Sequence, residues 1–452
     1  MKYLVLGMAR SGIAAADLLA GNGITAMICD KKTEKELGSD IAVLHEDNVE
    51  WHLGEDPMTL LDSADALVLS PGIPDTHPCV QAMRAAGKEV MAEIELAWRC
   101  FPGTTAAITG TNGKTTTTTL VTEILTAAGH KASAVGNIGV PFTGICSQAK
   151  AQDYAVCEVS SFQMETCSRF HPHVAAILNI TPDHLNRHGT MDVYIALKER
   201  TFANMLPDEA LVLNYDDPIT RDMAKRSPAR VCWFSRTCEP EFGAFVQNGN
   251  IVYGTPEKNT VLCPADEVRI PGAHNLENAL AASAMTMELG VAPEVIAKVL
   301  REFPGVEHRI ETFAEFGGVT WINDSKGTNT DSTIRAVRTM TKPTVLIAGG
   351  SEKKQDFAEM SAIIRDSMVR EVVLIGLVAP QMERQLREAG FTNIHNAGYD
   401  FEKAIHMSAE LARSGWNVLL SPANASFDMF PDYEERGRIF KNLVNRLGAE
   451  QR

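Results

Sequence analysis

The segment that decides the fold is Thr105-Ala106-Ala107-Ile108-Thr109-Gly110-Thr111-Asn112-Gly113-Lys114-Thr115-Thr116, an apolar strand running into a glycine- and lysine-containing turn. A helical pattern of apolar residues follows at Leu120, Val121, Ile124 and Leu125. Glycines let backbone N–H groups approach phosphate oxygens, a helix N-terminus favours anions, and Lys114 adds a point charge. The Thr115 hydroxyl stands where such loops bind magnesium. The sequence therefore predicts a phosphate-binding loop.

This loop is a shortened variant, because the strict spacing would need a glycine at the position of Ile108. The alternative interpretation is an ordinary glycine-containing turn with a solvated lysine. Against it stands the run Thr115–Thr119, in which every residue is β-branched at the start of a helix. Each such residue costs roughly half a kcal/mol relative to alanine, so helix propensity does not explain the run. Phosphate binding is the favoured interpretation.

Two further predicted strands lead to chemically useful side chains. The strand Tyr154–Val159 contains Glu158, and the strand Val174–Ile180 leads to Asp183 and His184. Ligands collect at the carboxyl ends of strands in an open parallel sheet, so we expect Lys114, Glu158 and His184 at one sheet edge. Taken singly, Glu158 could be a helix cap and His184 a surface imidazole. Their coincidence with the loop favours a shared site.

The whole chain alternates strands and helices, which predicts α/β domains with doubly wound parallel sheets. A chain of 452 residues exceeds what one hydrophobic core serves. We expect three domains with bounds 1–92, 93–305 and 306–452. The other predicted strands are Tyr3–Leu6, Thr25–Cys29, Ala66–Ser70, Val319–Asn323, Thr344–Ala348, Glu371–Ile375 and Asn417–Leu420.

The first domain contains Gly7-Met8-Ala9-Arg10-Ser11-Gly12, a degenerate form of the G-x-G-x-x-G dinucleotide turn with Ala9 in the middle. Asp30 follows at about the spacing at which an acidic residue reaches a ribose hydroxyl. This signal is weak alone, since a tight turn without a ligand accounts for it equally well. It also supports a rival hypothesis, an NAD-type oxidoreductase, for which nothing downstream offers a hydride-transfer site.

Composition narrows the class of protein. Hydrophobic residues make up 45% and charged residues 22%, which is typical of globular proteins. Nine scattered cysteines without a C-x-x-C pair indicate reduced thiols in a cytosol. A net charge of −15 disfavours general nucleic-acid binding. Because no apolar stretch is long enough to span a bilayer, we expect a cytoplasmic protein without membrane insertion.

Several motifs together resemble the Mur ligase family over essentially the whole chain. They are Gly110–Thr116, Glu158–Gln163, Asn179–Leu185, His274–Ala279, Asn323–Asn329 and Ser421–Asp428. The resemblance implies a Rossmann-like domain for a uridine nucleotide, a central ATPase-like phosphate-loop domain, and a C-terminal Rossmann-like domain for an amino acid. It is greatest to the members that add D-glutamate to UDP-N-acetylmuramoyl-L-alanine and release ADP.

The resemblance also implies roles for individual residues. Lys114, Glu158, His184 and Lys198 are the expected catalytic set. Two Mg²⁺ ions are expected, one at Thr115 and Glu158, the other at His184 and Lys198, with Lys198 as a carbamate formed from carbon dioxide. From the residues alone, Lys198 reads as an ordinary helix-surface lysine. The ATP contacts implied are Gly110, Thr111, Asn112, Gly113, Lys114, Thr115, Thr116, Asn278, Arg309 and Asp324.

The substrate contacts implied fall into two groups. For the uridine nucleotide substrate they are Ser11, Asp30, Gly72, Asn137, Ser160 and, unless they form a solvated turn, Lys31 and Lys32. For D-glutamate they are Lys326, Thr328, Lys353, Ser426 and Phe427. The chain departs from the family in two places: Asn424 stands where a cysteine is usual, and the turn 349–355 is looser, so Lys354 could replace Lys353.

Other functions are also compatible with the sequence alone. Mur ligases that add L-alanine, a diamino acid or a dipeptide share the ATP chemistry, as does folylpolyglutamate synthase. The segment Ala423–Asp428 fits the D-glutamate-adding members, and the Asp-Asn-Pro-Arg motif of diamino-acid-adding enzymes is absent. A regulatory nucleotide-binding module would not need Glu158, His184 and Lys198. We expect a monomer.

Overall fold

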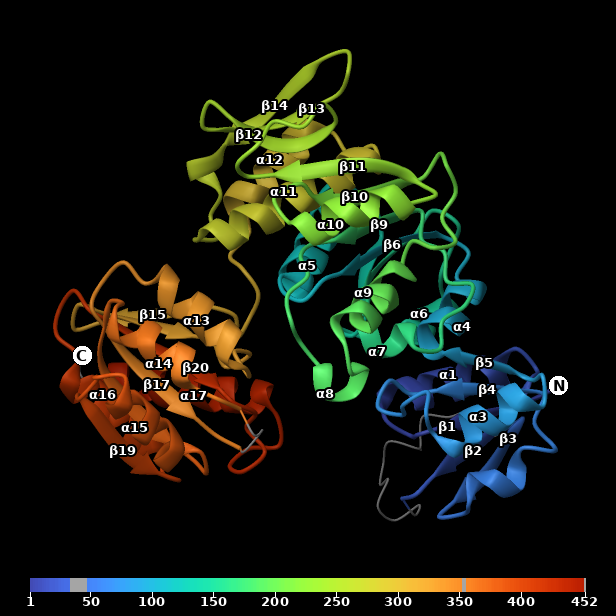
Figure 1. Cartoon of the computed structure of the whole chain (residues 1–452), viewed down its shortest axis with the longest axis horizontal. Coiled ribbons are helices and arrows are strands. Elements are labelled where there is room, and N and C mark those ends of the chain that lie inside the picture. The colour runs from blue at the N-terminus through green and yellow to red at the C-terminus, as the bar shows by residue number, and fades with distance from the viewer. Residues whose placement is uncertain (33–46, 352–354, 451–452) are drawn as a thin grey trace. The chain divides into compact units, whose positions relative to one another are not determined.

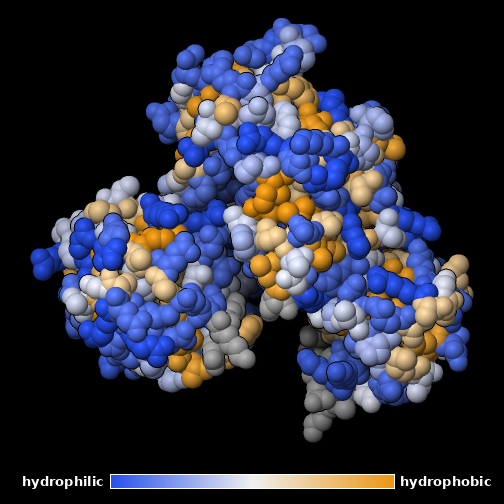
Figure 2. Space-filling view, viewed as in Figure 1, coloured by the Kyte–Doolittle hydropathy of each residue, from blue (hydrophilic) through white to orange (hydrophobic). Residues whose placement is uncertain are grey.

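The structure is a computed structural model that describes residues 1–32, 47–351 and 355–450 (Figure 1). It contains three sheets, each combined with helices, as the alternating pattern predicted. The chain divides into two compact units, Met1–Phe303 with the first two sheets and Pro304–Arg452 with the third. Within the described ranges, no helix has the length and apolar character needed to cross a membrane, and Figure 2 shows polar residues over most of the visible face.

The N-terminal sheet has five parallel strands in the order β3-β2-β1-β4-β5, which is Rossmann-like. Leu4 and Leu6 pack into one apolar cluster with α3, whereas Val5 packs into another with α1, so both faces of β1 are buried. The elements are β1 Lys2–Leu6, α1 Arg10–Gly21, β2 Thr25–Asp30, β3 Val49–Leu53, a 3₁₀ turn at Pro57–Leu60, β4 Ala66–Leu69, α3 Pro78–Ala85 and β5 Glu89–Ala92.

The turn between β1 and α1 depends on close backbone approach. Gly7 has a φ of +91°, and its amide donates to the Cys29 carbonyl at 2.9 Å. A Cβ added to Gly12 would lie 1.9 Å from the Gly7 carbonyl oxygen. The two glycines therefore allow the first helix to begin directly against the end of β1.

The central sheet has nine strands in the order β14-β13-β12-β11-β10-β9-β6-β8-β7. Its strands are parallel from β7 to β12, and β13 and β14 are antiparallel. Its strands are β6 Thr104–Thr109, β7 Ala132–Gly136, β8 Tyr154–Glu158, β9 Val174–Ile177, β10 Ala210–Asn214, β11 Arg230–Ser235, β12 Gly243–Gln247, β13 Asn250–Gly254 and β14 Asn259–Pro264.

Two helices that pack with the central sheet lie beside its carboxyl edge, α5 Lys114–Ala127 and α11 Ala273–Glu288. The others are α4 Glu93–Cys100, α6 Thr143–Cys146, α7 Ser161–Met164, α8 Leu185–His188, α9 Met191–Glu199, α10 Pro218–Met223 and α12 Pro293–Glu302, with 3₁₀ turns at Ala224–Arg226 and Ala265–Glu267. One apolar cluster runs from Val5 and Ala15 of the first sheet layer to Phe142 and Leu197 of the second.

The predicted strand Val174–Ile180 is too long, because β9 ends at Ile177. Beyond that point the backbone finds other partners. The Asn179 carbonyl accepts from the Thr111 amide at 2.9 Å, and the Ile180 amide donates to the Asp217 carboxylate at 2.8 Å. Asn179 therefore supports the phosphate loop, and Ile180 bonds to the N-cap residue of α10, instead of extending the ladder.

The third sheet has six strands in the order β15-β16-β20-β17-β18-β19, with β15 antiparallel to the rest. Leu346 and Ala348 of β17 face α13–α15, and Val345 and Ile347 face α16 and α17. The elements are β15 Glu311–Phe316, β16 Val319–Asn323, α13 Thr330–Thr339, β17 Thr344–Gly349, α14 Ala358–Arg365, β18 Val369–Ile375, α15 Ala379–Glu388, β19 Ile394–Gly398, α16 Phe401–Leu411, β20 Asn417–Ala423 and α17 Tyr433–Glu450.

Substituting Gly12→Ala tests the close approach in the first turn. The new Cβ collides with the Gly7 carbonyl, so we expect a loss of about 1–3 kcal/mol in unfolding free energy, measured as a lower thermal midpoint. The matched control is Gly21→Ala at the other end of α1, where a Cβ meets nothing within 4 Å. An equal midpoint for the two variants would contradict the packing argument.

Candidate functional site

The loop between β6 and α5 has a backbone that only glycine adopts readily at two points. Gly110 has a φ of +147° and Gly113 a φ of +84°. A Cβ on Gly113 would lie 2.2 Å from the Asn278 Oδ1 atom of α11, so the helix can begin only if this residue lacks a side chain. Thr115 and Thr116 are buried on the first turn of α5.

Asn179 braces this loop from the end of β9. Its Oδ1 accepts from the Asn112 amide at 2.9 Å, and its Nδ2 donates to the Asn112 carbonyl at 3.1 Å. The Thr111 hydroxyl donates to the Thr181 carbonyl at 3.1 Å and accepts from the Thr181 amide at 3.0 Å. Both backbone groups of Asn112 and the Thr111 hydroxyl are thus bonded to the segment that follows β9. This segment determines the backbone conformation of the loop.

Two lysines meet at the Gly110 carbonyl. Lys114 Nζ donates to it at 2.9 Å and to the Thr111 carbonyl at 2.8 Å. Lys198 Nζ, on α9, donates to the same Gly110 oxygen at 2.9 Å and to Thr109 Oγ1 at 3.3 Å. The interpretation of Lys198 as a helix-surface lysine is wrong, since it is only 1% exposed.

Burial lowers the pKa of Lys198 well below its ordinary value, and the positive charge of Lys114 lowers it further. Asp183 and Glu158 act in the opposite direction but do not cancel this shift. A lowered pKa favours the neutral amine. That is the form in which an amine reacts with carbon dioxide to give a carbamate.

Glu158 ends β8 and is buried. Its Oε1 accepts from the Asn137 side-chain amide at 2.9 Å. Its Oε2 is buried and has no hydrogen-bond partner among the residues that the structure describes. A buried carboxylate oxygen without a partner is costly, and a bound cation would satisfy it. Glu158 caps no helix, because Ser160 is the N-cap of α7 in a capping box with Gln163.

His184 lies at the N-cap position of α8 with a φ of +54°. Its ring is about half exposed, with Nε2 3.5 Å from Asp183 Oδ2. Partial burial lowers its pKa; Asp183 opposes this effect, while Lys114 and Lys198 reinforce it. The lowered pKa favours the neutral imidazole, the form required of a metal ligand.

The structure brings Lys114, Glu158, His184 and Lys198 together at the carboxyl edge of the central sheet, around the loop. The donor set would fit a hard divalent cation: the Glu158 oxygen without a partner among the described residues, the Thr115 hydroxyl, the His184 imidazole and, if Lys198 were carbamylated, two oxygens there. A bare ammonium at Lys198 would repel the cation, and its lowered pKa reduces that obstacle.

The predicted residues of the N-terminal sheet gather around its first turn. Asp30 Oδ2 accepts from the Met8 amide at 2.6 Å and Oδ1 from the Lys32 amide at 2.8 Å. Lys31 and Lys32 are exposed, Ser11 is partly buried, and Gly72 is exposed beyond the end of β4. Asp30 therefore supports the turn through the Met8 amide.

The predicted residues of the second unit lie near the carboxyl ends of β16 and β20. Asp324 accepts from Ser421 Oγ at 2.6 Å and from the Ile310 amide at 3.3 Å, and burial raises its pKa to about 7, against the opposing charge of Arg309. Within the described ranges, Arg309 Nε and Ser426 Oγ are buried without a hydrogen-bond partner.

The remaining predicted glutamate contacts differ in exposure. Phe427 is exposed, and Lys326 Nζ lies 5.4 Å from the centre of the Tyr433 ring. Thr328 is partly buried near the N-terminus of α13. Lys353 and its alternative Lys354 lie outside the described residues. Asn424, the departure from the family pattern, is fully buried.

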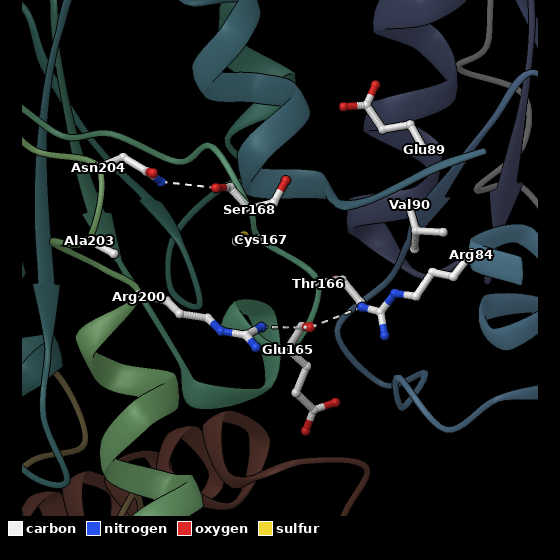
Figure 3. A pocket seen from close by; sticks show the side chains of 10 residues that line it. All are labelled: Arg84, Glu89, Val90, Glu165, Thr166, Cys167, Ser168, Arg200, Ala203 and Asn204. Atoms are coloured by element: carbon white, nitrogen blue, oxygen red, sulfur yellow. Dashed lines mark hydrogen bonds between the residues drawn. The ribbon is translucent and has the colours of Figure 1, made fainter. Parts of the chain in front are cut away.

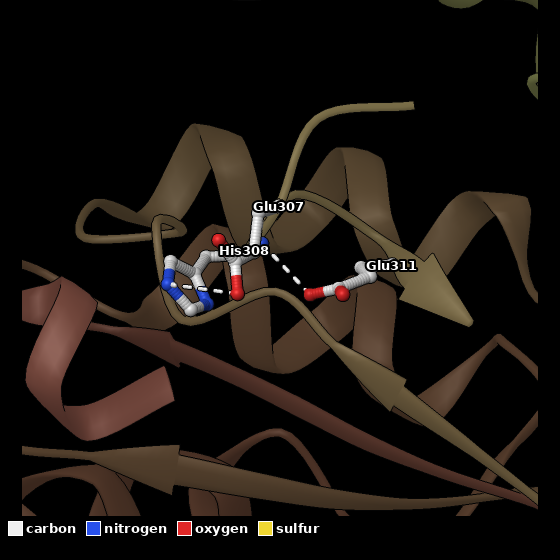
Figure 4. Close-up of side chains that lie close together, drawn as sticks. All are labelled: Glu307, His308 and Glu311. Carbon is white, nitrogen blue, oxygen red and sulfur yellow. Dashed lines mark hydrogen bonds and ion pairs between the residues drawn. The ribbon is translucent and has the colours of Figure 1, made fainter. Parts of the chain in front are cut away.

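One group of acids and histidine in the second unit has the appearance of a cation site, namely Glu307, His308 and Glu311 (Figure 4). Lys441 Nζ lies 3.0 Å from Glu307 and 2.5 Å from Glu311, so both acids already pair with a cation of the chain. His308 Nδ1 is 2.8 Å from the Asn323 amide. We therefore interpret this group as a structural ion-pair network.

Sequence patterns do not single out two residues of the site, Asn179, which lies within the motif Asn179–Leu185, and Tyr194. The Tyr194 hydroxyl lies 3.2 Å from Thr111 Oγ1, and Lys198 Nζ lies 4.7 Å from the centre of its ring. No local pattern marks either residue, because both act through segments distant in the sequence.

The strand–loop–helix geometry and its convergent side chains are typical of phosphate-loop nucleotide-binding domains. Three family models match: the Mur ligase MurD-like N-terminal domain over residues 1–92, the Mur ligase middle domain over 108–286, and the Mur ligase glutamate ligase domain over 308–424. The chain belongs to the Mur ligase family.

Relatives match along the full length of the chain. A protein of Alkaliphilus metalliredigens named UDP-N-acetylmuramoylalanine--D-glutamate ligase is 43% identical over 448 residues, covering 99% of this chain and 98% of that protein. A protein of the same name from Pelotomaculum thermopropionicum is 43% identical over 446 residues, with 99% and 98% covered.

Solved structures share the fold at low identity. The UDP-N-acetylmuramate-alanine ligase MurC of Thermotoga maritima aligns over all of both chains with a TM-score of 0.62 and 18% identity. MurF of Acinetobacter baumannii aligns over 98% of this chain and 93% of that one, with a TM-score of 0.61 and 16% identity. These likenesses support the three-sheet α/β architecture.

The Asn179→Ala substitution tests the brace on the loop. It removes both side-chain hydrogen bonds to the Asn112 backbone, each worth about 1 kcal/mol, so ATP should bind up to roughly 30-fold more weakly by calorimetry. Asn250→Ala is the control, because that side chain donates within its own hairpin, to the Asn248 carbonyl. Unchanged affinity in the Asn179 variant would mean that the loop holds its shape alone.

Proposed function

We propose that this protein is an ADP-forming ligase that adds D-glutamate to UDP-N-acetylmuramoyl-L-alanine in the synthesis of peptidoglycan precursors. The choice of substrates rests on the two relatives of that name, each 43% identical over nearly the whole chain. The use of ATP rests on the phosphate loop with the unpaired buried oxygen of Glu158 beside it. One observation carries the proposal: the chain that contains this phosphate-loop site also matches ligases of that name over nearly its full length.

The proposed reaction has two steps. The terminal carboxylate of the nucleotide substrate attacks the γ-phosphorus of ATP, which gives an acyl phosphate and ADP. The amine of D-glutamate then attacks the acyl carbon, and phosphate leaves. The first step brings two anions together, so positive charge at Lys114 and backbone amides of the loop would offset their repulsion. Orientation of three substrates supplies a further entropic advantage.

Magnesium would be held by Thr115 and Glu158 and, for a second ion, by His184 and a carbamylated Lys198. When bound, such ions neutralise charge on the transferring phosphoryl group. The lowered pKa of Lys198 and the Glu158 oxygen that has no hydrogen-bond partner among the described residues support this assignment. His184 serves better as a ligand than as a base for the amine, because it lies beside the metal-binding groups.

The remaining assignments extend the proposal to each substrate and to the three domains 1–92, 93–305 and 306–452. ATP is assigned to the loop Gly110–Thr116 and to Asn278, Arg309 and Asp324. The uridine nucleotide is assigned to Ser11, Asp30, Lys31, Lys32, Gly72, Asn137 and Ser160. D-glutamate is assigned to Lys326, Thr328, Lys353, Ser426 and Phe427. We further propose a monomer that acts in the cytoplasm, where ATP and uridine nucleotides occur.

The proposed substrates are tested by phosphate release from ATP. With UDP-N-acetylmuramoyl-L-alanine present, we expect release with D-glutamate and none with L-glutamate, L-alanine, D-alanine or a diamino acid. Release with another amino acid of the panel would place the chain among the other ligases of the family. No release with any of them would contradict the proposed reaction.

The Lys198→Ala substitution tests the carbamate. Turnover should fall by roughly 10²- to 10³-fold, the loss typical when one charge-stabilising group is removed. An added short carboxylate such as formate should restore part of it, because it can place two oxygens in the vacated space. The control is Lys131→Ala, which removes an exposed lysine paired with Asp153. Full activity of the Lys198 variant would refute the carbamate.

A further inference from the structure

Glu165, directly after α7, is a buried acid that is not among the proposed catalytic or binding residues. Its carboxylate accepts a two-pronged contact from Arg187 of α8, with Nε to Oε1 at 2.8 Å and the terminal nitrogen to Oε2 at 2.6 Å. The Asp75 amide also donates to Oε2 at 3.3 Å. Such a fork holds the guanidinium plane in one orientation.

Arg187 and His184 both pack against the Phe162 ring, which connects them. The guanidinium carbon lies 4.2 Å from the centre of the Phe162 ring, and that ring lies 4.7 Å from the imidazole of His184, centre to centre. Arg187 and His184 are both on the single turn of α8, while Phe162 is on α7. The Phe162 ring is therefore in contact with both.

The next residue of α8 is fixed by the same acid. The His188 ring is buried, with Nε2 2.9 Å from Ser161 Oγ and Nδ1 3.5 Å from Glu165 Oε1. It also stacks on Tyr194, with ring centres 5.7 Å apart. Tyr194 is the ring beneath Lys198. His184 and Lys198, the two expected ligands of the second metal ion, are thus connected through one set of packed side chains.

This support is needed because α8 cannot hold His184 by itself. A helix of four residues has too few hydrogen bonds to be stable alone. The left-handed φ of His184 is strained and persists only where the surroundings enforce it. The half-exposed imidazole has Asp183 as its polar neighbour, at 3.5 Å.

The backbone of Glu165 extends the network to the N-terminal sheet layer. Its carbonyl accepts from Arg200, just beyond α9, at 3.0 Å and from Arg84 of α3 at 3.4 Å. Figure 3 shows this carbonyl between the two guanidinium groups, with the carboxylate directed away from both. Both arginines line a pocket of about 450 Å³.

We propose that Glu165 and Arg187 are positioning residues that orient His184 through the Phe162 ring. Their fork sets the ring plane against which the imidazole rests, and so aims the imidazole at the cation beside the phosphate loop. The link to catalysis rests on the proposed function, but the orientation of His184 is a property of the chain alone and can be measured alone.

The test of orientation is the NMR spectrum of the histidine ring protons in the intact protein without ligands, at one fixed pH. In wild type the Phe162 ring shifts the His184 signals, which a His184→Gln variant identifies by their loss. Arg187→Met keeps an apolar stem of similar length but removes the fork, and Glu165→Gln removes the acceptor charge. We expect the His184 signals to move toward those of an unstacked histidine in both variants.

The matched control is Arg221→Met. Arg221 of α10 also stacks on an aromatic ring, 5.5 Å from the centre of Tyr215, but at a distance from α8 in the chain. Its loss should leave the His184 signals in place. Arg187→Lys serves as a second variant should the Met variant fold poorly, since it keeps the charge but cannot form the fork.

In kinetic assays, loss of the fork should reduce kcat and raise the magnesium concentration for half-maximal activity, each by about 10- to 100-fold, as for other partners that orient metal ligands. The KM for D-glutamate should not change. Unmoved His184 signals in folded Arg187→Met or Arg187→Lys would overturn the positioning role. A wild-type enzyme without ligase activity would instead refute the proposed function and leave the NMR result standing.

Discussion

The structure of the site depends on one close approach, that of the phosphate loop to α11 at Gly113. A side chain at this residue would collide with Asn278 Oδ1, and the positive φ would strain any other residue. Because α5 can then begin at Lys114, the first backbone amides of the helix and the Lys114 charge both lie at the phosphate loop. Asn179 completes the arrangement by bonding both backbone groups of Asn112.

Around this loop the chain buries charges that folding alone would not favour. Lys198 is almost fully buried beside Lys114, and Glu158 leaves one buried oxygen unpaired among the described residues. Buried polar groups without a partner reduce stability, and ionisable groups with shifted pKa values cluster at functional sites. In the proposed assignment, a divalent cation and a carbamate on Lys198 would supply the partners that these groups lack.

Two of the proposed site residues lie on short elements, which longer elements support. Helices α7 and α8 are single turns, yet they present Ser160 and His184. The Glu165–Arg187 fork and the Phe162 ring tie these turns together, and the Glu165 carbonyl ties them to α3 and α9. Rigid sheets on either side therefore determine the geometry of a site that is built from loops.

The sequence by itself determined the α/β class, the phosphate loop and the alignment of Lys114, Glu158 and His184 along one sheet edge. These features follow from local periodicity and from the rule that parallel strands end together. It could not determine the burial of Lys198, the brace at Asn179 or the antiparallel strands after β12. Those depend on partners far along the chain, as when Lys198 bonds to Gly110, 88 residues away. Only the folded structure decides which distant backbone group stands opposite a given side chain.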